Sequence, residues 1–227
     1  MTRVRSQMAG NSRASLAFYA FARFLTVDVF AGLWNRTRVE GAEHVPTEGP
    51  FILAPVHRSN MDTPYAAATT RRRLRFMGKD SLWTAKVPAW TLSALGGFPV
   101  SRGTVDREAL RRCTEVLQAG EPLVVFPEGE RKSGPVVQPL FEGAAYLAAR
   151  AGVPIVPVGI GGSERAMPKG ARFIRPTKVV VVVGEPLRLE ASDGGARVPR
   201  EATRELTARL HDELQRLFDT AQIRASA

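Results

Sequence analysis

The stretch Phe51-Ile52-Leu53-Ala54-Pro55-Val56-His57-Arg58-Ser59-Asn60-Met61-Asp62 joins a short apolar run to two side chains suited to proton transfer. The apolar run predicts a buried strand that delivers His57 at its carboxyl end, where ligands of open α/β sheets gather. Asp62 follows five positions later, and a strand-to-helix turn between the two residues lets their side chains converge. Asp62 then accepts a hydrogen bond from one ring nitrogen and leaves the other free to take a proton.

The same aspartate also has a purely structural interpretation. Asp62 precedes Thr63-Pro64, a pattern typical of the capped start of a helix. A histidine with an acidic residue five positions later also arises often by chance, since roughly one residue in ten is acidic. Taken alone, the pair leaves the catalytic and the capping interpretations open.

Short apolar runs alternate with amphipathic segments after Val39, which predicts an α/β fold: a single domain with a central, mostly parallel or mixed sheet flanked by helices. The expected strands are Phe51–Val56, Leu74–Met77, Phe98–Ser101, Leu123–Phe126, Ile155–Ile160 and Lys178–Val183. The expected helices are Val105–Gln118, Gly143–Arg150 and Thr203–Phe218. Cys113 falls on the apolar face of the first helix, so we assign it to the core. Gly159–Gly162 and Ser192–Val198 are expected to be loops.

The charge and cysteine content narrow the classes of partner and cofactor. The formal net charge of the 227 residues is +10 at pH 7, which favours anionic partners such as lipid headgroups or phosphorylated substrates. The basic clusters are not interleaved with stacking aromatic residues, so nucleic acid is not an expected partner. His44, His57 and His211 lack metal-ligand spacing, and we expect no metal. The single cysteine excludes an intrachain disulfide.

The N-terminal stretch Leu16–Trp34 is apolar and aromatic, but Arg23 and Asp28 interrupt it. A bilayer-spanning helix needs about 20 mostly apolar residues without central charges, so we expect one or two amphipathic helices. Aromatic residues among arginines suit a helix that lies in the membrane interface. A helix docked on the core of its own domain is the alternative. We therefore divide the chain near residue 38, into an amphipathic interfacial segment (1–38) and a catalytic domain (39–227).

Three further blocks of sequence place polar residues after or around expected strands. They are, in order, Gly96–Arg102, Phe126–Arg131 and Val153–Val158. Arg102 and Arg131 thus follow strand ends, as His57 does, where one pocket can hold a phosphate against a base. Lys79, after another expected strand, is a third candidate cation.

In their order and spacing, the His57–Asp62 block (an HX4D motif) and these three blocks resemble the glycerolipid acyltransferase family, which includes the 1-acyl-glycerol-3-phosphate acyltransferases. The resemblance covers about Gly41 to Gly184. It implies an α/β fold in which His57 is the general base and Asp62 orients it. The residues that it places near the phosphate of the acceptor are Arg102, Glu128, Gly129 and Arg131.

The implied activity is transfer of a fatty-acyl group from acyl-CoA or acyl-carrier protein to a hydroxyl of a glycerol-phosphate-type acceptor, with lysophosphatidic acid favoured, in phospholipid biosynthesis. No cofactor besides that co-substrate is implied. The resemblance also implies an N-terminal membrane anchor, and it favours peripheral or monotopic attachment to the anionic cytoplasmic face of the cell membrane. Two departures, Glu130 in place of a usual threonine and Glu142 where lysine is frequent, bear on the choice of acceptor.

Other functions differ from this one in what they require. A serine hydrolase or thioesterase needs a nucleophile, and the sequence has no Gly-x-Ser-x-Gly pattern; Ser59 is the serine that lies near His57. A phospholipid transacylase, or an acyltransferase for another lipid acceptor, shares the four blocks. A non-catalytic membrane-binding module is the least favoured alternative, because His57 and Asp62 are both intact.

Overall fold

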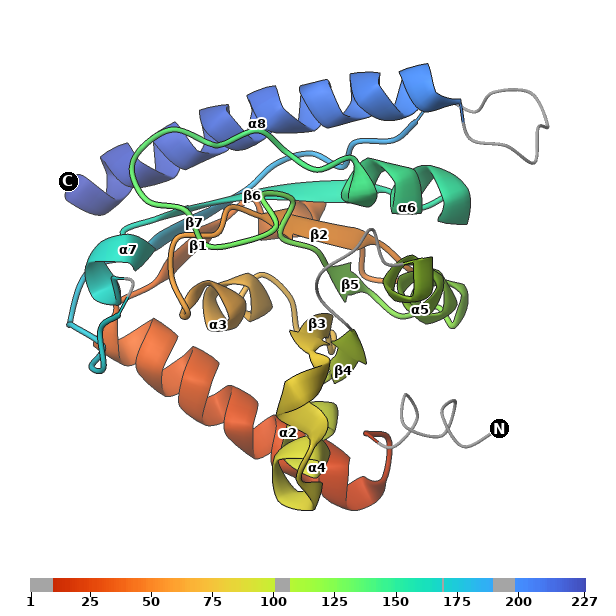
Figure 1. Ribbon diagram of the computed structural model, residues 1–227. Helices are drawn as coiled ribbons and strands as arrows, with labels where there is room; N and C mark the ends of the chain where they lie inside the picture. Colours follow the sequence, from red (N-terminus) through yellow and green to blue (C-terminus); the bar gives the residue numbers. More distant parts are fainter. Residues whose placement is uncertain (1–9, 101–106, 169, 190–198) are drawn as a thin grey trace.

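The computed structural model describes residues 10–100, 107–168, 170–189 and 199–227, apart from the side chain of Lys79. In this part of the chain a seven-stranded sheet forms the centre of the molecule (Figure 1). Its strands are β1 (Arg38–Glu40), β2 (Ile52–Pro55), β3 (Arg75–Lys79), β4 (Gly97–Val100), β5 (Leu123–Val124), β6 (Ile155–Gly161) and β7 (Val180–Val183). Their spatial order is β1-β7-β6-β2-β5-β3-β4.

The strand β2, which leads to His57, lies at the centre of the sheet and runs parallel to both of its neighbours, β5 and β6. All four of its residues are buried, as the uninterrupted apolar run predicts. β3 and β4 continue the parallel part, whereas β7 pairs antiparallel with β6. The sheet is therefore mixed, and the predicted α/β fold class is confirmed.

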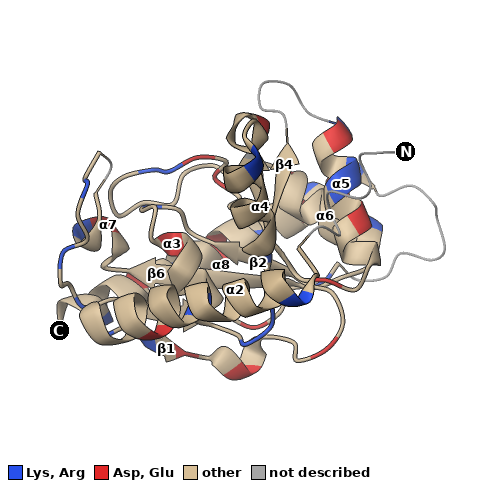
Figure 2. Ribbon diagram, turned by 90° about the horizontal axis from the view of Figure 1, so that it is seen from below, with Lys and Arg blue, Asp and Glu red and all other residues tan. Residues whose placement is uncertain are grey.

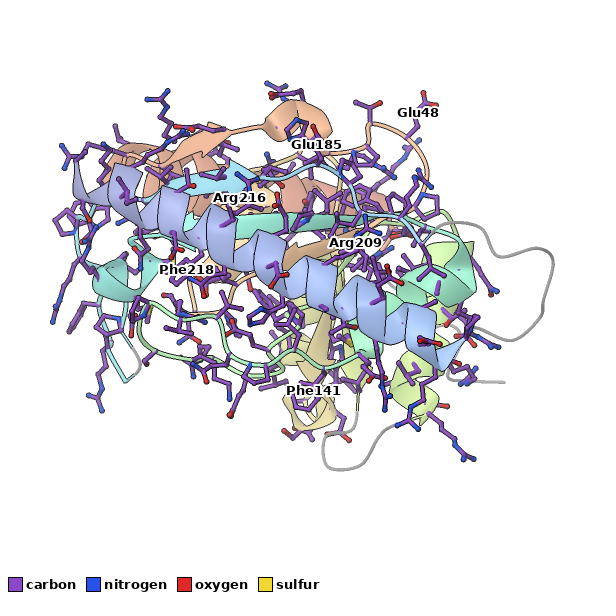
Figure 3. All side chains as sticks on the ribbon, turned by 90° about the horizontal axis from the view of Figure 1, so that it is seen from above. Glu48, Phe141, Glu185, Arg209, Arg216 and Phe218 are labelled. Atoms are coloured by element: carbon purple, nitrogen blue, oxygen red, sulfur yellow. The ribbon has the colours of Figure 1, made fainter. Side chains whose placement is uncertain are left out.

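Helices cover both faces of the sheet. They are, in chain order, α2 (Arg13–Arg23), η1 (Phe24–Trp34), η2 (Ala42–His44), α3 (Asp62–Ala67), η3 (Asp80–Trp83), α4 (Lys86–Ala94), α5 (Arg107–Gln118), α6 (Gly143–Ala151), α7 (Ser163–Ala166) and α8 (Arg200–Ser226). α8 lies over one face of the sheet, whereas α3 and the N-terminal helix lie on the other side (Figure 1). Figure 3 shows α8 running lengthwise across its face, with Arg209, Arg216 and Phe218 among its side chains.

Each expected strand overlaps an observed one, and the three expected helices are present as α5, α6 and α8. Cys113 is 1% exposed, so its assignment to the core is confirmed. The strand β1 is an addition, because its Arg-Val-Glu sequence carries no apolar run to signal it. The expected loop Ser192–Val198 lies outside the described residues.

The prediction of a loop over Gly159–Gly162 is wrong for most of its length, because β6 continues through Gly161. These glycines let α8 pack directly on the strand. A Cβ atom at Gly159 would lie 2.4 Å from the α8 backbone, and one at Gly161 would lie 2.2 Å from it. Only Gly162, with φ of +85°, leaves the strand and begins the turn into α7.

The N-terminal elements α2 and η1 form one continuous helix over Arg13–Trp34, and its second half is wound as a π-helix. By length and composition alone, this 22-residue helix is able to cross a membrane. One side of it docks on the domain: Arg23 donates to the Ala67 carbonyl of α3 at 2.6 Å, and Val27 and Ala31 are buried. The other side exposes large apolar side chains, which are Leu16, Phe21, Phe24, Phe30, Leu33 and Trp34.

Of the two alternatives that the sequence left open, docking on the domain is observed on one side of this helix, and attachment to a membrane stays a prediction. Seen from below, the helix lies along the molecule, and most of its ribbon is neither blue nor red (Figure 2). Arg23, which interrupts the apolar stretch, is on the docked side and bonds to α3. The helix therefore docks on its own domain with one side and presents an apolar surface with the other.

Candidate active site

His57 follows the buried strand β2 closely, at the edge where the parallel strands end. Its ring stacks on Phe126 with the ring centroids 4.0 Å apart, and 18% of the side chain stays exposed. Nδ1 of His57 lies 3.0 Å from Oδ2 of Asp62. A carboxylate only accepts hydrogen bonds, so Nδ1 carries the proton, and Nε2 is the nitrogen left to accept one from a substrate.

Asp62 is the first residue of α3, and its side chain turns back toward β2. Oδ2 accepts hydrogen bonds from the backbone N–H groups of Arg58 and Ser59, at 2.5 and 2.6 Å, as well as from the His57 ring. No side-chain hydrogen bond caps the start of α3. The capping interpretation is therefore wrong for the described residues around this helix, and three hydrogen bonds fix the carboxylate that orients the histidine.

A buried polar chain lies behind this pair. Tyr65 of α3 is fully buried and donates to Oδ1 of Asn35 at 2.9 Å. Burial, with a smaller contribution from the charge of Asp62, raises the pKa of the Tyr65 phenol, which therefore stays a hydrogen-bond donor. Nδ2 of Asn35 donates in turn to the carbonyls of Arg175 and Thr177. The helix that carries Asp62 is thus connected to the residue that follows the N-terminal helix.

Arg58 and Glu128 form an ion pair in which neither side chain is exposed, with Nη1 2.7 Å from Oε2. Oε2 also accepts the backbone N–H of His57 at 3.2 Å, and Oε1 accepts that of Gln138 at 3.0 Å. Both oxygens of Glu128 are therefore used inside the protein. The sequence predicts Glu128 as a substrate-binding residue, but this burial favours a different role, which is to position the backbone of His57.

Arg58 is a residue of the site that sequence reasoning missed. Its Nε and Nη2 donate to the carbonyls of Gly134 and Val136, and its guanidinium lies 4.8 Å from the centre of the Phe218 ring on α8. These bonds fasten the loop before α6 to the end of β2. Arginine side chains are usually exposed, so the sequence gives little reason to expect a buried arginine here. The only indication that Arg58 belongs to the site is that it directly follows His57.

The turn after β5 depends on a glycine. Gly129 has φ of +74°, and its N–H donates to the Phe126 carbonyl at 3.0 Å. A Cβ atom here would lie 2.6 Å from the ring of Phe141. Both the backbone conformation and the close approach therefore require glycine. Since its N–H is used within the turn, Gly129 shapes the loop beside His57, and its contact with an acceptor stays a prediction.

Two of the predicted phosphate-binding cations, Arg131 and Lys79, lie at or after the carboxyl ends of the neighbouring strands β5 and β3. Arg131 follows β5, and the N–H of the next residue, Lys132, donates to the His57 carbonyl at 2.9 Å. Arg131 is half-buried. Lys79 ends β3, two strands and about 10 Å from β2. Arg102 lies outside the described residues. The structure therefore brings Arg131 close to the backbone of His57. Lys79 lies farther from His57, on the same side of the sheet, where the parallel strands end.

The two acidic departures from the resembled family each have a cationic neighbour. The carboxylate of Glu130 lies 2.8 Å from Nζ of Lys132. Glu142, at the start of α6, lies 3.5 Å from Arg204 of α8. The side chain of Glu130 is 70% exposed and that of Glu142 is 44% exposed. The negative charge that each one adds is thus partly balanced within the protein.

Neither a serine nucleophile nor a metal centre is apparent among the described residues. Ser59 is fully buried, and its hydroxyl donates to the Met167 carbonyl at 2.9 Å. It is therefore not presented to a substrate as a nucleophile. In the same part of the chain, no group of three His, Cys, Asp or Glu side chains is placed to hold a metal ion.

A histidine held by a buried aspartate, with one ring nitrogen free of hydrogen bonds to the described residues at the carboxyl ends of the parallel strands, has the geometry that general-base catalysis requires. Residues 36–161, more than half of the chain, match the protein family described as Acyltransferase. The chain belongs to this acyltransferase family. The resemblance drawn from the four sequence blocks is thereby confirmed.

Individual relatives agree with this membership. The chain is 28% identical to the chloroplastic 1-acyl-sn-glycerol-3-phosphate acyltransferase BAT2 of Brassica napus, over 75% of this chain and 50% of the relative. It is 30% identical to the 1-acyl-sn-glycerol-3-phosphate acyltransferase of Streptococcus pneumoniae, over 64% of this chain and 54% of the relative. The chain spans about half the length of these curated relatives.

The fold also has a solved counterpart. The crystal structure of the 1-acyl-sn-glycerophosphate acyltransferase PlsC from Thermotoga maritima superposes with a TM-score of 0.72. The two chains are 24% identical, and the match covers 96% of this chain and 95% of PlsC. The whole architecture, including the N-terminal helical part, is therefore similar to that of PlsC.

Proposed function

We propose that this chain transfers a fatty-acyl group from an acyl thioester to a hydroxyl of a phosphorylated glycerolipid, with lysophosphatidic acid as the favoured acceptor. The donor is acyl-CoA or acyl-carrier protein. The observation that carries the proposal is the 3.0 Å hydrogen bond from His57 Nδ1 to Asp62, which leaves Nε2 as a base. The names of the relatives, which are 1-acyl-sn-glycerol-3-phosphate acyltransferases, support this choice of acceptor.

The proposed reaction is a direct transfer. Nε2 of His57 takes the proton of the acceptor hydroxyl while the oxygen attacks the thioester carbonyl carbon. The tetrahedral intermediate then breaks its carbon–sulfur bond, and the leaving thiolate recovers the proton from His57. A positioned base of this kind contributes roughly 10²–10⁴-fold to the rate. The buried carboxylate of Asp62 stabilises the imidazolium that forms during the reaction.

The acceptor's phosphate is assigned to the cations on the same edge of the sheet. Arg131 is the strongest candidate, because the next residue is bonded to the His57 backbone and because its guanidinium has no hydrogen bond within the described residues. Lys79 and Arg102 are proposed to extend this binding surface. Gly129 keeps its proposed place beside the acceptor, whereas Glu128 acts by holding His57.

We further propose that residues 1–38 attach the chain to a membrane and that residues 39–227 form the catalytic domain. The exposed apolar side of the N-terminal helix supports interfacial attachment to a membrane. The location that we propose is the cytoplasmic face of the cell membrane. The docked side argues against a free spanning helix, because Arg23 and Val27 are engaged with the domain.

The test is an acyl-transfer assay with the full chain and lysophosphatidic acid. His57→Ala and Asp62→Asn are expected to lose at least 10²-fold in kcat/KM, and His57→Ala is expected to keep its thermal stability. Arg131→Ala is expected to lose far more activity with lysophosphatidic acid than with monoacylglycerol, its dephosphorylated counterpart. Near-normal turnover by a folded His57→Ala variant would end the general-base assignment. Transfer from a phospholipid but from no thioester would identify a transacylase instead.

A further inference from the structure

The segment after α7, residues 170–178, has a composition unlike its surroundings. Its sequence is Gly-Ala-Arg-Phe-Ile-Arg-Pro-Thr-Lys, with three cations and no acidic residue. Phe173 is 82% exposed, and its neighbours Arg172 and Arg175 are exposed as well. We call residues 170–178 the cationic loop. Figure 2 shows positively charged segments along it, beyond α7.

The backbone of the cationic loop is held at several points. The N–H of Arg175 donates to the Ala166 carbonyl at 2.8 Å. Nε1 of Trp34 donates to the Ile174 carbonyl at 3.1 Å, and Nδ2 of Asn35 donates to the Arg175 carbonyl at 2.8 Å. The exposed Phe173 is therefore carried on a fixed backbone, so its outward position belongs to the folded structure.

These hydrogen bonds also place the cationic loop against the end of the N-terminal helix, as Figure 1 shows for the segment after α7. Leu33 and Trp34, at that end of the helix, are 78% and 49% exposed. A single exposed apolar side chain is ordinary, whereas a group that continues from one element to another marks an interaction surface. The exposed end of the helix is thus hydrogen-bonded to the loop that carries the exposed Phe173.

We propose that the cationic loop is a second membrane-contact element, in which Phe173 enters an anionic lipid surface while Arg172 and Arg175 bind the headgroups. The absence of acidic side chains from residues 170–178 fits a negatively charged surface, and an aromatic tip between arginines fits the interface. The proposal rests on the proposed membrane location. It does not depend on the reaction at His57.

This contact adds a geometric constraint to the site. The hydroxyl of Ser59, two residues after His57, donates to the Met167 carbonyl just before the cationic loop. Asn35 connects the same loop to Tyr65 on the helix that begins with Asp62. Two contact elements, the helix and the loop, fix the orientation of the molecule on the membrane better than one. They thereby keep the end of the sheet that carries His57 at a fixed distance from the membrane surface.

A fluorescent label at position 173 tests the contact directly. Cys113 is the only cysteine; it is buried, and burial raises the pKa of its thiol to about 12, so an environment-sensitive thiol label on F173C reports that position alone. With phosphatidylglycerol vesicles, the emission is expected to shift to the blue. The same label on A208C, at an exposed position of α8, is the matched control and is expected to stay unchanged.

Charge variants of the full chain complete the experiment. The pair R172Q/R175Q is expected to weaken vesicle binding by roughly fivefold for each arginine removed. The matched pair R200Q/R209Q on α8 removes the same charge and is expected to have a much smaller effect. Equal label responses with pure phosphatidylcholine vesicles would overturn the role of the arginines.

Two further outcomes would separate the inference from the proposed function. If the full chain binds vesicles but the label at 173 does not respond, the loop contact is wrong and the helix alone attaches the protein. If the unaltered chain does not bind vesicles, the membrane location itself fails. A label response that follows protein concentration without lipid would mean that a second copy covers Phe173, and it would overturn the proposal.

Discussion

The surroundings of His57 and the outer side of the N-terminal helix are built in opposite ways. Around His57, charged side chains such as Asp62, Arg58 and Glu128 are at most 1% exposed and are fixed by hydrogen bonds. On the helix, large apolar side chains such as Phe21 and Leu33 are exposed by 60% and 78%. A base needs a fixed geometry, which buried polar networks provide. An exposed apolar surface of the kind that we propose for membrane contact needs only suitable composition, so its residues need no tight packing.

Removing a charge from the buried network is expected to have the largest effect on stability. Glu128→Gln leaves the Arg58 guanidinium buried without its ionic partner, and such a loss costs about 3–5 kcal/mol in the free energy of unfolding. Urea denaturation measures this change. The exposed pair Glu213–Arg216 offers the matched control: Glu213→Gln is expected to cost less than about 1 kcal/mol. Similar costs for the two variants would contradict the contrast drawn above.

A smaller loss is expected where the network meets the end of the N-terminal helix. Tyr65→Phe removes the donor that satisfies Oδ1 of Asn35, leaving a buried acceptor unpaired at a cost of about 1–3 kcal/mol. Because Asn35 holds the cationic loop, vesicle affinity is expected to fall together with stability. Thermal denaturation and vesicle co-sedimentation measure the two effects. Unchanged stability and unchanged vesicle affinity would show that the hydrogen bonds from α3 through Asn35 do not support the cationic loop.

The smallest effect on stability is expected on the outer side of the helix. Phe24→Ser changes a side chain that is 53% exposed, so the free energy of unfolding should move by no more than about 0.5 kcal/mol. Vesicle binding should weaken, because apolar surface is lost from the membrane contact. Val27→Ser, on the docked side of the same helix, is the control and should destabilise the fold. A large loss of stability in Phe24→Ser would mean that this side is packed in the folded protein.

The sequence alone predicts those parts that depend on local patterns. The apolar run of β2 predicts the buried strand, and a strand-to-helix turn between His57 and Asp62 allows their side chains to converge. The Arg58–Glu128 pair is different, because 70 positions separate its partners and each residue taken alone suggests an exposed side chain. Similarly, Gly159 suggests a loop until the packing of α8 is known. What escapes prediction is the set of features that arise only when distant segments meet.

The central place of β2 has a consequence for how the chain folds. Ile52 pairs with both Leu123 and Ile155, which lie about 70 and 100 positions further along the chain. During synthesis, β2 leaves the ribosome long before either neighbour, with both of its edges open to the wrong strand. A chaperone that binds β2 would shield those edges until β6 has been synthesised. The side chain of His57, which follows β2, therefore reaches its final surroundings only after β6 has been made, although the residue itself is made early.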